Sequence, residues 1–157
     1  AYLREAQLKA SAVIPNSAMA VLMDVGEVNN IHPMDKEKGG NRLAFQALAK
    51  TYGIEGFEFE SPTYKSMEIK DGSVTVSFNN VENGITSYDK EVIGFELAGE
   101  DKIFYPAKTV VRRKSVVLTS DKVVKPVAIR YLFKDFAKAE LFSGGGLPIS
   151  SFRTDEW

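Results

Sequence analysis

The strongest local signal for the fold is the stretch MEIKDGSVTVSF, residues 67–78. Apolar side chains occupy every second position on both sides of Asp71-Gly72. This alternation is typical of strands with one buried face, and Asp-Gly is a preferred sequence for a two-residue hairpin turn. We therefore expect an antiparallel hairpin here, with Val74, Val76 and Phe78 on its buried face.

Similar alternation continues toward the C-terminus. It recurs in residues 93–97, 116–118 and 127–133, and turn-forming clusters separate these runs. Several short strands at this spacing are typical of an antiparallel sandwich or barrel. We expect an antiparallel β-sandwich domain over residues 54–157, with a linker at its start.

The N-terminal third has a different pattern. Residues 2–12 have helical spacing, residues 18–25 are a continuous apolar run, and a second helical pattern extends from about residue 35 to residue 52. A short apolar run between turns predicts a buried strand of the parallel type. The second helix should pack its apolar face, Leu43, Ala47, Leu48 and Tyr52, and end at Gly53. Residues 1–53 thus predict one βα step, too small to bury both faces of a sheet alone.

The composition excludes several kinds of site. The chain has no cysteine and one histidine, which excludes thiolate and multi-histidine metal sites, and we expect neither a metal nor an organic cofactor. Its net charge is −1, so nothing favours nucleic acid. No apolar run approaches the roughly 20 residues that span a bilayer. We expect neither nucleic acid nor membrane as a partner.

The most informative polar segment is DVGEVNNIHP, residues 24–33, which contains His32. It places this histidine in a loop after the predicted strand, and sites in open α/β sheets form at the carboxyl ends of strands. An imidazole with a pKa near ~6.5 can take a proton from a hydroxyl and return it to a leaving alcohol. Lone loop histidines are more often surface residues, so spacing alone does not decide between the two interpretations.

Several segments together resemble the sialate O-acetylesterases, which belong to the SGNH-hydrolase group of carbohydrate esterases. The block that contains the histidine matches at residues 23–26, 29–33, 40–44 and 52–53. Residues 3–7 are similar to the helix before that block, and residues 94–101 and 126–131 are similar to the terminal β domain of the family. The resemblance extends over nearly the whole chain.

This resemblance implies a fold and an activity. The fold is an α+β fragment: residues 1–53 form the last βα unit of an SGNH-type, flavodoxin-like α/β hydrolase domain, and residues 54–157 form the β-sandwich. The activity is hydrolysis of O-acetyl esters on sugars such as sialic acid, in which a histidine activates a serine. His32 matches that histidine.

The third catalytic residue is left open by the resemblance. The wider group has an aspartate three residues before the histidine, where this chain has Asn29. An amide can orient an imidazole but cannot stabilise imidazolium by charge. Two alternatives remain for the third residue. The site could be a Ser-His dyad without one, or the carboxylate could come from Asp24, Glu27 or Asp35.

The nucleophile is not found in this sequence. The family's serine lies in a Gly-Asp-Ser-like or Gly-Gln-Ser-like block, which does not occur here, and Ser17 precedes the predicted strand. We expect an upstream part of the same polypeptide to supply the serine, so that the chain alone is inactive. We expect the protein to act on an acetylated carbohydrate in the periplasm or outside the cell. The alternatives are an acetylxylan esterase of the same group and a non-catalytic carbohydrate-binding or accessory module that stacks sugars on Phe133, Phe136 and Phe142.

Overall fold

The hairpin predicted at Asp71-Gly72 is formed by strands β1 (Thr63–Lys70) and β2 (Ser73–Asn79) of the computed structural model, which describes residues 1–157. Lys70 lies opposite Ser73, so the connection has two residues. Asp71 and Gly72 have φ angles of 51° and 75°. Positive φ at both central residues is the geometry that follows the twist of the flanking strands, and Asp-Gly adopts it at low cost.

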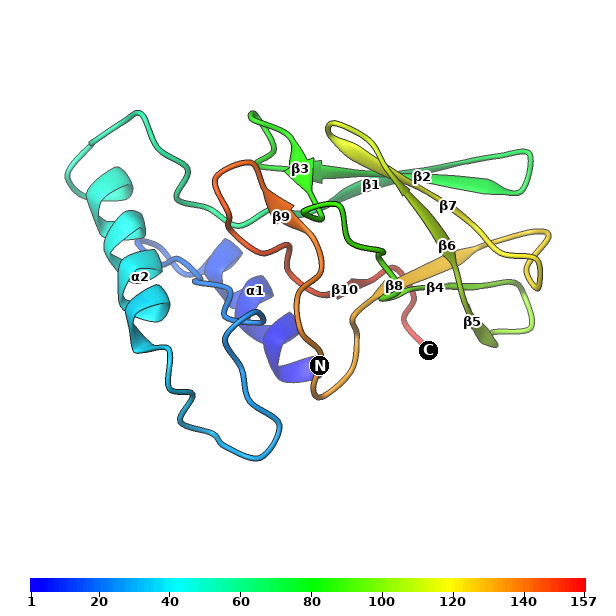
Figure 1. The fold of residues 1–157 in the computed structure, drawn as a ribbon, viewed down its shortest axis with the longest axis horizontal. Helices are drawn as coiled ribbons and strands as arrows, with labels where there is room; N and C mark the ends of the chain where they lie inside the picture. The colour runs from blue at the N-terminus through cyan, green and yellow to red at the C-terminus, as the bar shows by residue number, and fades with distance from the viewer.

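Two four-stranded antiparallel sheets form the larger part of the molecule (Figure 1). The first has the order β1-β2-β7-β6 and the second β10-β8-β4-β5, and β3 pairs with β9 in a small separate sheet. The remaining strands are β3 (Ile85–Thr86), β4 (Phe95–Ala98), β5 (Phe104–Pro106), β6 (Lys108–Val111), β7 (Ser115–Thr119), β8 (Ala128–Tyr131), β9 (Phe142–Ser143) and β10 (Phe152–Arg153).

Side chains of both sheets meet in one apolar core. Val74, Val76 and Phe78 of β2 are at most 4% exposed, as the alternation predicts. The second sheet contributes Phe95 and Tyr131, whose ring centroids are 4.5 Å apart. Burial of each such side chain stabilises the fold by about 1.5–3 kcal/mol relative to an exposed position.

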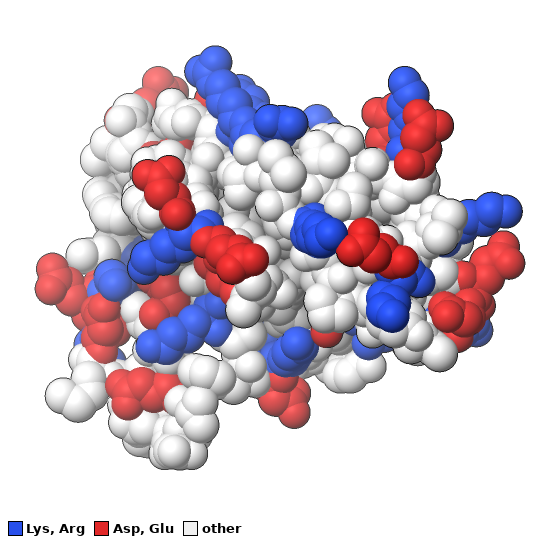
Figure 2. All heavy atoms as spheres, turned by 45° about the vertical axis from the view of Figure 1, so that its right-hand side comes forward, with Lys and Arg blue, Asp and Glu red and all other residues white.

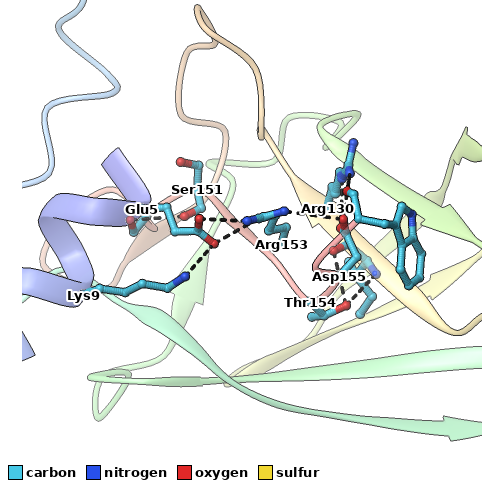
Figure 3. Close-up of polar contacts among 10 residues, drawn as sticks. Glu5, Lys9, Arg130, Ser151, Arg153, Thr154 and Asp155 are labelled. Carbon is cyan, nitrogen blue, oxygen red and sulfur yellow. Dashed lines mark hydrogen bonds and ion pairs between the residues drawn. The ribbon is translucent and has the colours of Figure 1, made fainter. Parts of the chain in front are cut away.

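The two helices, α1 (Tyr2–Val13) and α2 (Lys36–Lys50), lie on one side of the molecule, away from the tips of the hairpins (Figure 1). Helix α1 has no fully buried residue, and polar side chains attach it to the sheets. Glu5 accepts hydrogen bonds from Arg153 of β10 at 3.1 and 3.2 Å, and Arg153 also approaches Asp155 (Figure 3). Arg130 of β8 donates to the same aspartate, which is buried. The chain of charges therefore connects α1 to β10 and β8.

The bounds of α2 agree with the sequence, but its orientation does not. Asp35 caps its N-terminus by accepting a hydrogen bond from the backbone of Lys38, and Gly53 follows its C-terminus with a φ of 67°. Most of the predicted apolar face is uncovered: Leu43 and Tyr52 are 62% and 72% exposed, Ala47 is exposed and Leu48 is half-buried. The buried side chains of the helix are instead Arg42 and Gln46. Both donate hydrogen bonds to backbone carbonyl groups outside the helix.

The strand predicted at residues 18–25 is wrong for this structure. The segment is irregular and ends in a turn at residues 23–25. Val21, Met23 and Val25 are buried and Leu22 is 41% exposed, so the alternation of an extended segment persists in part. A strand also requires a neighbour that pairs with its backbone, and no strand of this chain pairs with the segment. The backbone N–H groups of residues 18–22 have no partner in the chain.

The face shown in Figure 2 carries both signs of charge, interspersed over the surface rather than gathered in one patch of either sign. This distribution agrees with the nearly balanced total of 20 basic and 21 acidic residues. Neither helix has the length and apolar character needed to cross a membrane.

Candidate active site

The candidate site is the loop of residues 26–35 between the irregular segment and α2. A turn brings the N–H groups of Val25 and Gly26 to the carbonyl oxygen of Leu22 and so directs the chain into the loop. Glu27 and Asn30 then pair across a narrow bend. The loop ends at the N-terminal cap of α2.

His32 lies exposed in this loop. Its backbone N–H donates a hydrogen bond of 2.9 Å to Oδ1 of Asn30, and this is the one hydrogen bond in which the residue takes part. Both ring nitrogens are thus free for a proton donor or acceptor from outside the chain. A general base needs one ring nitrogen free to accept the proton of its nucleophile, and this structure leaves that nitrogen free.

Asn29, the residue at the position of the group's aspartate, is also exposed. It lies in the same loop as His32, but no hydrogen bond joins the two side chains. In this structure the asparagine therefore does not fix the imidazole.

The three carboxylates that the sequence offers as alternatives all have other partners. Asp24 binds both terminal nitrogens of Arg42, at 2.6 and 2.7 Å. Asp35 caps α2. The pKa of this aspartate is lowered mainly by the hydrogen bond from the backbone N–H of Lys38, and next by the hydrogen bond from the side chain of Lys38. Glu27 accepts the backbone N–H of Met34 at 2.8 Å. None of the three contacts the ring of His32.

Arg42 is a structural residue of the site that sequence spacing did not identify. It is 6% exposed and also donates to the carbonyl oxygen of Val21 at 2.7 Å. It thereby joins α2 to the segment that leads into the loop. The sequence contains both Asp24 and Arg42, but their separation of 18 residues gives no local signal of pairing.

No serine of the chain forms a pair with His32. The hydroxyl of Ser17 donates to the carbonyl oxygen of Ile14 at 2.7 Å, and Ser143 donates to Glu58. These serines satisfy local backbone and loop contacts. The arrangement of nucleophile and base within hydrogen-bond distance that covalent catalysis needs is therefore not formed by the chain itself.

A hollow of about 730 Å³ adjoins the loop. Asn30, Ile31 and Pro33 line it from the loop, on both sides of His32 in the sequence. Its other apolar walls come from α1, the irregular segment, α2 and the segment before β9; they include Ile14, Met19, Leu22, Leu43 and Phe136. The uncovered face of α2 thus contributes to this hollow.

The three phenylalanines of the sugar-stacking hypothesis do not form an exposed row. Phe133 is 9% exposed, and the ring of Tyr2 meets it edge-on at a centroid distance of 5.2 Å. Phe142 packs against Tyr88 at 5.3 Å. Only Phe136 is substantially exposed, at 42%. No group of three or more histidine, aspartate or glutamate side chains is placed to hold a metal ion.

Comparison with known proteins finds similarity among solved structures. No family model matches the sequence, and no curated protein matches it. Among solved structures, the fold is similar to that of XAC1771, a carbohydrate acetylesterase from Xanthomonas citri, with a TM-score of 0.91 and 35% sequence identity. The alignment covers 99% of this chain and 36% of that one, so the chain spans about a third of the length of its relative. Over nearly its whole length, the chain is therefore related to a carbohydrate esterase.

Proposed function

We propose that the chain is the C-terminal part of a carbohydrate O-acetylesterase of the sialate O-acetylesterase type, and that His32 is its catalytic base. The observation that carries the proposal is the unpartnered ring of His32, exposed in a loop of a chain that aligns over 99% of its length with a carbohydrate acetylesterase. Covalent hydrolysis of an ester needs such a base beside a hydroxyl nucleophile.

The reaction that we propose is acyl transfer in two steps. A serine from outside residues 1–157 attacks the acetyl carbonyl, and His32 accepts the hydroxyl proton. His32 then returns this proton to the departing sugar oxygen, which leaves an acetyl-serine. Water repeats the sequence, with His32 again as base and then as acid toward the serine oxygen, and acetate is released.

The uncovered surfaces support a partner for residues 1–53. The segment 18–22 offers unpaired backbone N–H groups, which a neighbouring strand could pair. Leu43 and Ile31, on α2 and the loop, are 62% and 89% exposed beside the same hollow. We propose that an α/β esterase domain in the upstream part of the same polypeptide covers them and brings its serine to His32, and that the two antiparallel sheets form the appended β-sandwich.

The first experiment compares wild type and His32→Ala in the longer polypeptide that carries the serine. We expect the substitution to reduce acetate release by at least ~1,000-fold, since removal of a triad member has effects of this size, while circular dichroism and the unfolding midpoint stay unchanged. Retained turnover in His32→Ala would refute the proposal. As a further arm, residues 1–157 alone should hydrolyse p-nitrophenyl acetate no faster than their own His32→Ala variant.

The substrate is tested separately with O-acetylated sialic acid and acetylated xylan. Release from sialic acid supports the sialate assignment, and release only from xylan assigns the acetylxylan branch of the group. Sugar binding without turnover in the longer polypeptide would instead favour the accessory module. We further propose a periplasmic or extracellular location.

A further inference from the structure

Glu27 lies near the start of the candidate loop and accepts hydrogen bonds from two later residues of the loop. Its Oε1 accepts the backbone N–H of Met34 at 2.8 Å, and its Oε2 accepts a hydrogen bond from the side-chain amide of Asn30 at 3.4 Å. One carboxylate therefore closes the loop around residues 28–33. His32 lies within the closed segment.

The second contact continues to the histidine itself. Asn30 donates to Glu27 through Nδ2 and accepts the backbone N–H of His32 through Oδ1 at 2.9 Å. The backbone of His32 is thus held by Asn30, which is in turn held by Glu27. Glu27 also holds the part of the loop after His32 directly, through the backbone N–H of Met34.

Apolar packing contributes little to the shape of this loop. Val28, Ile31 and Met34 are 65%, 89% and 84% exposed. An exposed loop loses conformational freedom only where specific contacts compensate for the entropy. The hydrogen bonds of Glu27 and Asn30 are the contacts available here.

We propose that Glu27 is the positioning residue for His32; this inference rests on the proposed function. It acts through the loop backbone and not on the ring, because its two oxygens are bound to Met34 and Asn30. It is thus distinct from the third catalytic residue, which would hold a ring nitrogen.

The test uses the longer polypeptide with Glu27→Ala, Glu27→Gln and the matched control Glu55→Ala, an exposed glutamate in the segment after α2. We expect Glu27→Ala to lower kcat by about 10- to 100-fold with little change in KM, since a small displacement of a catalytic group costs this much. Glu27→Gln should restore most of the rate, because an amide oxygen still accepts the Met34 N–H. Its pH profile of kcat/KM should match that of wild type.

The possible results separate the two claims. Wild-type rates in Glu27→Ala, together with an inactive His32→Ala, would refute the role of Glu27 and leave the proposed function intact. An inactive Glu27→Gln with an altered pH profile would show that Glu27 is catalytic and not positioning. Full activity in His32→Ala would refute the proposed function, and the positioning role with it.

A second measurement uses residues 1–157 and does not depend on activity. In Glu27→Ala, amide hydrogen exchange at His32 and Met34 should accelerate by at least about 10-fold, since local opening governs exchange. Exchange in the core strands should stay as in wild type, and Glu55→Ala should change neither region. Unchanged exchange at both loop amides would refute the closure of the loop by Glu27.

Discussion

At the scale of single residues, the most consequential contact is the ion pair between Asp24 and Arg42. The side chains are 11% and 7% exposed, and two short hydrogen bonds join them. Removal of one member of a buried pair leaves the other charge without compensation. The pair also explains why α2 turns a polar face inward, which the apolar pattern of the helix did not predict.

We expect Arg42→Ala to lower the free energy of unfolding by about 3 kcal/mol, because Asp24 keeps its charge in a largely buried place. Lys38, 4.0 Å from Asp24, compensates only in part. Arg42→Lys should recover part of the loss, since an ammonium group cannot reproduce the two parallel hydrogen bonds. Urea unfolding measures both variants. An Arg42→Ala midpoint equal to that of Arg112→Ala, an exposed control, would contradict this expectation.

At the scale of elements, prediction from sequence succeeded where the signal is local. The β1–β2 hairpin follows from alternation and a two-residue turn, and the ends of α2 follow from Asp35 and Gly53. It failed at residues 18–25, because apolar content indicates burial but cannot supply the neighbour that makes a strand. The positions of Asn29 and His32 in one exposed loop could be predicted. The loop contacts of Glu27 could not, because the sequence does not show which backbone groups a carboxylate reaches.

The attachment of α1 should depend on pH. Hydrogen bonds from Arg153 lower the pKa of Glu5 below its ordinary value of 4.5. A carboxylate whose pKa is depressed in the folded state contributes stability above its unfolded pKa and loses it as the pH falls through the folded value. We therefore expect wild type to be more stable than Glu5→Gln above pH 4.5 by a constant amount, and the difference to vanish at lower pH.

Chemical unfolding at a series of pH values measures this difference. Asp121→Asn is the control. The pKa of Asp121 is also lowered, first of all by the hydrogen bond that Lys108 donates to it. This aspartate is exposed and does not contact α1. Helicity followed by circular dichroism should respond to the Glu5 substitution and not to the control. An equal difference between wild type and Glu5→Gln at pH 3 and pH 7 would contradict the proposed contribution of the Arg153 contact.

At the scale of the whole molecule, the two parts differ in completeness. The antiparallel sheets enclose their own core, and Val21 and Met23 join it from the N-terminal part. The helices and the loop between them leave backbone donors, an apolar helix face and the ring of His32 without partners. An acetylesterase relative is about three times as long. We expect these features if, as we propose, a second surface carries the nucleophile.

Labelling of the longer polypeptide with a fluorophosphonate tests that explanation most directly, because the reagent reacts with a serine that a base has activated. We predict that peptide mapping finds the label on a serine outside residues 1–157 and that His32→Ala abolishes the labelling. A label on a serine within residues 1–157, or undiminished labelling in His32→Ala, would contradict the account.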